Sequence, residues 1–155
     1  SVSRWIGDLD KRQANLGRSV VSSNKKILVN FSYAAGVLRF YDIKNGSLVH
    51  RKDAVVKPMN FKVKNDDYQL QDGLGFLDAS ISDNYVYALY SGEKENFNAP
   101  MPTASYVYKY DYQGNLKDVY HLDKAAFTLA VKNDDSQLFT IVDDPNSKIF
   151  VYNLK

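Results

Sequence analysis

The chain has no cysteine and only two histidines, and these absences exclude several kinds of chemistry. Without cysteine it can form no disulfide, no thiolate nucleophile and no cysteine-based metal site. His50 and His121 are too few for a multi-histidine active site or a histidine-based zinc site. We expect no metal site and no cofactor.

Two further absences concern membranes and nucleic acids. No apolar run approaches the ~20 residues that span a bilayer, and the chain carries no visible targeting signal. Lys and Arg number 20 and Asp and Glu 18, which leaves a net charge of only +2. Nucleic-acid-binding proteins normally concentrate a larger basic excess on one face. We expect no transmembrane segment in this chain and no binding to DNA or RNA.

The residues that are abundant favour β-structure. The chain has 155 residues, the length of one ordinary domain, and it holds 12 Tyr and 8 Phe against one Trp. Its apolar runs are short and are separated by Asn, Asp, Gly and Ser, which is typical of chains rich in β-hairpins. The sequence predicts an all-β fold of antiparallel strands.

An internal repeat shows how these strands are grouped. Residues 40–48 (FYDIKNGSL) resemble residues 109–116 (KYDYQGNL), and residues 151–154 (VYNL) match the start of both. Each copy follows a second hairpin with a polar turn, at residues 20–29, 79–89 and 129–139. The unit therefore has four antiparallel strands, which is the blade of a β-propeller.

The repeat predicts about three blades in a single partial domain that covers residues 1–155. Their approximate ranges are 18–51, 76–122 and 127–155, and the third blade has no fourth strand. Residues 60–70 form an extra hairpin or the remnant of a reduced blade. A closed ring needs about four to eight blades, so the length corresponds to roughly half of a propeller.

A resemblance to a known family supports this interpretation. Residues 77–92 (LDASISDNYVYALYSG) resemble the TolB-like six-bladed propellers found as bacterial cell-envelope lipoproteins, and YVYALYSG is their most specific part. The strand at 106–111 with Gly114-Asn115, and the ending at 149–154, agree with the same family. The chain is similar to the C-terminal half of such a protein.

The resemblance implies a six-bladed fold, a lipoprotein anchor upstream of this chain and a location in the cell envelope, either periplasmic or at the surface. It brings no catalytic residues. We expect a non-catalytic binding or scaffold module whose partner is an unidentified protein or small molecule. The alternative is a hydrolase- or lyase-type enzyme that uses acidic residues in the central channel of the complete propeller.

Two loops are the first candidates for ligand binding. Residues 92–103 form the longest loop within a blade, and Glu93, Lys94 and Phe97 give it charge and an aromatic ring. Long loops on rigid scaffolds often carry recognition, although an insertion without a role would have the same composition. Tyr33 lies in the shorter equivalent loop of the first blade.

Acidic residues are the second group of candidates. Asp143 and Asp144 join two strands of the last blade, and Asp78 lies on a first strand, where it would face the central channel. Asp143 and Asp144 also suit an ordinary turn, because Asp side chains form hydrogen bonds with the backbone of turns. None of the Asp-Asp pairs has the spacing of an EF-type calcium loop.

Blade packing gives two further expectations. Tyr106, Tyr108, Tyr110 and Tyr112 share one face of a strand, where they should pack between blades. A three-blade arc also leaves two faces open, and we expect them to carry residues such as Val29, Phe31 or Ile141. Such faces favour a homodimer, or association with the missing N-terminal half.

Overall fold

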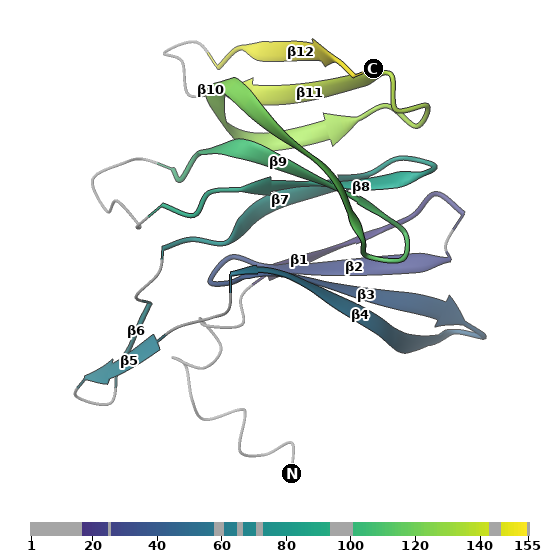
Figure 1. Cartoon of the computed structure of the whole chain (residues 1–155), viewed down its shortest axis with the longest axis horizontal. Helices are drawn as coiled ribbons and strands as arrows, with labels where there is room; N and C mark the ends of the chain where they lie inside the picture. The colour runs from purple at the N-terminus through teal and green to yellow at the C-terminus, as the bar shows by residue number, and fades with distance from the viewer. Residues whose placement is uncertain are drawn as a thin grey trace.

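The computed structural model describes residues 17–24, 26–57, 61–64, 67–70, 73–93, 101–142 and 147–154. Within these residues, antiparallel strands form sheets of four, two and six strands (Figure 1). The first sheet contains β1 (Gly17–Val21), β2 (Ile27–Ser32), β3 (Gly36–Lys44) and β4 (Ser47–Lys57). The small sheet contains β5 (Phe61–Lys64) and β6 (Asp67–Leu70), within the range of the expected extra hairpin. The third contains β7 (Phe76–Ile81), β8 (Tyr85–Tyr90), β9 (Ala104–Asp111), β10 (Leu116–Val131), β11 (Gln137–Val142) and β12 (Ile149–Asn153).

The predicted all-β fold of antiparallel propeller blades is confirmed. In the part of the chain that the structure describes, no helix is both long and apolar enough to cross a membrane.

The first sheet is one blade, in which β1 to β4 pair in sequence order. Its last hairpin turns at Asn45-Gly46, with Lys44 directly opposite Ser47. The φ angles of Asn45 and Gly46 are 50° and 76°, both in the left-handed region. A two-residue turn of this kind matches the twist of the flanking strands, and Asn-Gly adopts it at low steric cost. The sequence motif therefore sets the register of this hairpin.

The long strand β10 belongs to two blades. Its first part pairs with β9, from Leu116 to His121, and its last part pairs with β11, from Ala126 to Val131. The register shifts between His121 and Ala126. The first part is thus the outer strand of the second blade, and the last part is the inner strand of the third. The sequence places a break between residues 122 and 127, whereas the structure carries one strand through it.

The blades stack face to face. Figure 1 shows β1 to β4 as one layer, β7 to β9 as the next, and β11 and β12 as the last, with the β5–β6 hairpin standing to one side. The strand β8 in the middle layer is buried on both faces. Val86, Ala88 and Tyr90 belong to the core against the first blade, while Tyr87 and Leu89 belong to the core against the third. Double burial explains why YVYALY is continuously apolar instead of alternating.

The three tyrosines of β9 and Tyr112, which follows it, show the expected pattern in three of four cases. Tyr108, Tyr110 and Tyr112 pack in or against the core between the first two blades. The rings of Tyr110 and Phe40, which come from different blades, have centroids 6.1 Å apart. Tyr106 is instead 44% exposed, and its ring lies against the ring of His121 on the neighbouring strand, with the two planes inclined at 36°.

The expectation for the open faces was wrong for two of its three residues. Val29 and Phe31 are fully buried in the core between the first and second blades. They point toward the next blade and not away from it, because the face of a strand depends on register, which the repeat alone does not supply. Ile141 is 37% exposed, as expected for an uncovered face.

We predict that Leu89→Ala destabilises the protein by about 2–5 kcal/mol, because it leaves a cavity between two blades. Leu89 is fully buried. The matched control is Leu116→Ala on β10, where the leucine is 51% exposed and the cost should stay within ~0.5 kcal/mol. Urea unfolding measures both values. Equal costs at the two positions would contradict the buried inter-blade core.

Candidate functional site

The turns at one end of the blades share a structural device. Ser22 and Ser82 are buried at the ends of β1 and β7. The Oγ of Ser22 accepts N–H bonds from Lys26 and Ile27, at 3.2 and 3.1 Å. The Oγ of Ser82 accepts them from Asn84 and Tyr85, at 3.2 and 2.9 Å. A buried serine thus closes each turn and fixes the residues that follow it.

Polar contacts between these turns join neighbouring blades. The Ser23 hydroxyl donates to Asp83 at 2.9 Å, which links the first blade to the second. Asp135 links the second to the third, since its carboxylate accepts bonds from the Asn84 amide at 2.9 Å and the Tyr87 hydroxyl at 3.0 Å. Burial, and then the bond to Asp135, raise the pKa of Tyr87 far above its usual value. These groups are engaged with one another, so their role is to hold the blades together.

An open groove between the first and second blades is a candidate site. We call it the inter-blade groove, and it has a volume of about 280 Å³. Its walls combine two isoleucines, four charged residues and two residues from the turn after β9. They are Lys26, Ile27, Asp42, Ile43, Lys44, Arg51, Tyr112 and Gln113.

The electrostatics of the groove centre on Asp42. Arg51 Nη2 donates to Asp42 Oδ1, and Lys44 Nζ lies 3.5 Å from Asp42 Oδ2. The hydrogen bond from Arg51 is the largest cause of a lowered pKa at Asp42. Arg51 Nη1 also donates to the backbone oxygen of Tyr112 at 3.3 Å, which ties the two blades together at the groove. The lining holds three cations, Lys26, Lys44 and Arg51, and one carboxylate, so it carries an excess of positive charge.

The turn that brings Tyr112 and Gln113 to the groove is held by Asp111. Its carboxylate accepts hydrogen bonds from the backbone N–H groups of Gln113 and Asn115, at 3.0 and 2.8 Å. It also forms an ion pair with Lys117 at 2.9 Å. Gly114 has a φ of 78°, and a Cβ there would lie 3.1 Å from the Phe40 ring. This close approach and the left-handed backbone together require glycine.

Asp78, predicted as a ligand residue, is a structural bridge. Its carboxylate accepts hydrogen bonds from the N–H of Ala79 at 2.9 Å, from the N–H of Leu129 at 3.0 Å and from the hydroxyl of Thr128. Thr128 and Leu129 lie on the inner part of β10. Asp78 therefore joins the inner strands of the second and third blades, which makes its carboxylate a poor candidate for ligand binding.

Two other predicted residues meet at one segment. The Tyr33 carbonyl accepts the N–H of Gly75 at 2.6 Å, and the Glu93 carbonyl accepts the N–H of Leu74 at 2.7 Å. The Tyr33 ring packs edge-on against Phe31, whereas Glu93 is exposed. The backbones of Tyr33 and Glu93 thus flank the segment that leads into β7. The remaining predicted site residues, Lys94, Phe97, Asp143 and Asp144, lie outside the described residues.

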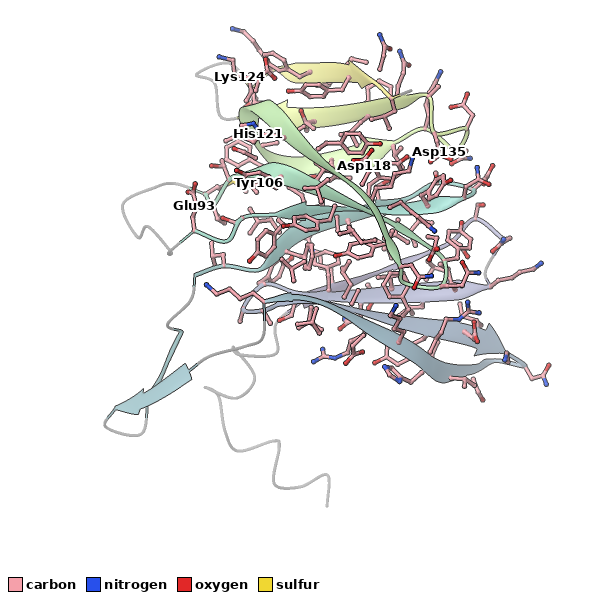
Figure 2. All side chains as sticks on the ribbon, viewed as in Figure 1. Glu93, Tyr106, Asp118, His121, Lys124 and Asp135 are labelled. Carbon is pink, nitrogen blue, oxygen red and sulfur yellow. The ribbon has the colours of Figure 1, made fainter. Side chains whose placement is uncertain are left out.

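The two histidines lie in different blades. His50 on β4 contacts Asp53 Oδ1 at 2.8 Å, and the ring of His121 on β10 lies tilted against that of Tyr106, with ring centroids 4.9 Å apart. Figure 2 shows Tyr106 and His121 together at the outer edge of the second blade, at the opposite end from Asp135. Across the described ranges, no group of three or more acidic or histidine side chains is placed to hold a metal ion.

Sequence reasoning missed the inter-blade groove. The only available signal was the Tyr-Asp repeat, which places Asp42 and Asp111 at equivalent positions of two hairpins. The repeat indicates two similar turns, but the contact between Arg51 and Tyr112 depends on how the blades stack. No short motif contains that information.

Comparison with known proteins agrees with the geometry. A family model described as TolB-like 6-blade propeller-like matches residues 12–134. The β-propeller domain of Cps50 (Swd1) from Myceliophteria thermophila superposes with a TM-score of 0.59 at 11% identity, covering 89% of this chain and 38% of that one. A functionally unknown protein from Desulfotomaculum acetoxidans gives 0.51 at 9% identity, covering 86% of this chain and 39% of that one. Such low identities show the fold alone. The chain spans less than half of either structure, and no curated protein matches it.

The environment of Asp111 predicts a loss of stability in acid. Burial acts to raise its pKa, but the bonds from Asn115 and Lys117 outweigh it and lower the pKa from 3.8 to about 2. A lowered pKa in the folded state adds stability above the unfolded pKa, and that stability disappears as the pH falls through the folded pKa. We expect Asp111→Asn to be less stable than the wild type at about pH 5.5, and the gap to shrink toward about pH 2. Urea unfolding at both pH values tests this, and a constant gap would contradict it.

Proposed function

Because the chain belongs to the TolB-like six-bladed propeller family, we propose that it is part of a non-catalytic binding or scaffold module of the bacterial cell envelope. The envelope location is supported by the similarity of residues 77–92 to TolB-like lipoproteins. The module would present a rigid surface to a protein or a small molecule.

The acidic group on the inner strands already forms hydrogen bonds within the protein, and this supports a non-catalytic role. Asp78 is the one acidic residue among the described residues of β1, β7 and the last part of β10. A general acid or base needs an oxygen within reach of the substrate. Both Asp78 oxygens are already bonded, one to the N–H of Ala79 and the other to Thr128 and Leu129. The alternative of hydrolysis or lyase chemistry in the channel draws no support from these residues.

The charge of the inter-blade groove is the observation that carries the binding proposal. Asp42 neutralises one positive charge and is already paired with Arg51 and Lys44. Lys26 is exposed at the rim of the groove, and the lining carries three cations against one carboxylate. An anionic group placed there would lie among ammonium and guanidinium donors. We therefore propose that the groove receives an acidic group of the ligand.

Titration with inorganic phosphate tests the proposed binding site. We expect weak binding that decreases as salt is added and that weakens at least ~5-fold in the Lys26→Gln, Lys44→Gln double variant. The matched control is Lys124→Gln with Lys132→Gln, which removes the same charge from exposed positions outside the groove lining. Two-dimensional NMR measures the affinity and shows whether Ile43 and Gln113 respond. If the two double variants lose the same affinity for phosphate, net charge alone explains the effect, and the proposed site is rejected.

Cell fractionation tests the proposed location. In the bacterium that encodes the protein, we expect an antibody against this chain to detect it in the envelope fraction. A cytoplasmic enzyme followed in the same samples controls for leakage. Recovery of the chain together with that enzyme would contradict an envelope location.

A further inference from the structure

The third blade has one uncovered apolar face. Ile141 on β11 and Ile149 and Val151 on β12 are 37%, 67% and 52% exposed. Ile141 lies directly opposite Ile149, and Phe139 lies directly opposite Val151. Directly opposed side chains on one face of an antiparallel pair are in contact range, so these four residues form one continuous patch. We call it the front face of the third blade.

The corresponding faces of the other two blades are covered. The second strands β2, β8 and β11 occupy equivalent places in the three blades. Val29 and Phe31 on β2 are buried against the second blade, and Tyr87 and Leu89 on β8 are buried against the third. Phe139 and Ile141 occupy the same places on β11. A front face in this chain is thus built to pack on the next blade, and the third has none within the described residues.

The opposite end of the stack has the complementary opening. The face of the first blade that points away from the second blade carries Val21, Leu48 and Val55, which are 48%, 54% and 55% exposed. Leu28 and Tyr41 are half-buried between them. We call it the back face of the first blade. The back faces of the second and third blades are buried in the two cores.

We propose that two copies of this chain pair through these faces, so that the front face of each third blade packs on the back face of the partner's first blade. Three blades turn through half of a six-bladed ring, and a second half related by a two-fold axis completes it. Both new contacts are then equivalent, as closed two-fold symmetry requires. The family sets the number of blades at six.

The two junctions inside the chain show what such a contact would look like. In both, a front face meets a back face, and the neighbouring turns lie side by side through the Ser23–Asp83 and Asn84–Asp135 bonds. The same arrangement at the new junction brings the turn that contains Asp134 next to the partner's turn that contains Lys26. Both side chains are exposed, so opposite charges would meet beside the apolar contact. The turn that contains Asp134 also carries exposed Lys132, so charge alone does not select the partner. A second copy is favoured by the six-blade count of the family and by the two junctions of this kind that the chain already forms.

Light scattering coupled to size exclusion tests the proposal on the whole 155-residue chain. We expect a mass of twice 17.6 kDa at micromolar concentration. Ile149→Lys on the front face and Val21→Lys on the back face should each return the chain to the monomer mass, because either charge would be buried at both junctions. The matched control is Val119→Lys, a position 41% exposed on the outer strand of the second blade and on neither open face. It should leave the dimer intact.

Three outcomes would overturn the proposal. One is a wild-type monomer that persists as concentration rises. Another is a dimer that Ile149→Lys breaks and Val21→Lys leaves intact, since that pattern means two front faces packed together. The last is a mass that keeps growing with concentration, which means that the ring does not close. Far-UV circular dichroism confirms that each variant is folded. Phosphate binding is a separate readout, so either proposal can fail without the other.

Discussion

Burial of both faces of each sheet is the constraint on which the rest of the structure depends. The strand β8 meets it fully, with Val86, Ala88 and Tyr90 turned to one blade and Tyr87 and Leu89 to the other. A single sheet of this kind has no stable existence alone, because its apolar faces are stabilised only by neighbouring sheets. The stack, and not the individual blade, is therefore the folding unit. The front face of the third blade does not meet this requirement, because its apolar side chains are exposed.

Because apolar side chains fill the stacked faces, polar residues lie mainly near the strand ends. They have two separate roles there. Buried Ser22 and Ser82 close turns, and Asp78 and Asp135 bridge neighbouring blades, so these groups are committed to the structure. The inter-blade groove differs, because its cations outnumber its single carboxylate. A rigid scaffold with an unbalanced charge at a junction between blades is suited to binding. At this groove Arg51 reaches across to the backbone of Tyr112, which joins the two blades.

The open ends of the stack connect the fold to assembly. The back face of the first blade contains Val21 and Val55, and the front face of the third contains Ile149 and Val151, all about half exposed or more. Contiguous exposed apolar patches often mark contact surfaces between proteins. Pairing of the two ends would bury both without any new kind of interaction, because the chain already forms that junction twice. Assembly and groove binding involve different residues, apart from the charge of Lys26.

The sequence by itself determined the local elements, because strand propensity and turn chemistry act over a few residues. It predicted the Asn45-Gly46 hairpin, the antiparallel blades and the packing of Tyr108 and Tyr110 between them. It did not predict that β10 continues through two blades, that Val29 and Phe31 face inward, or that Asp78 is bonded to Thr128. It also missed the groove. These features depend on register and on contacts between residues about 50 or more positions apart, as in the Asp78–Thr128 and Arg51–Tyr112 pairs. Only the stacking of complete sheets brings such residues together, so the tertiary structure alone decided which polar groups hold the blades and which remain available to a ligand.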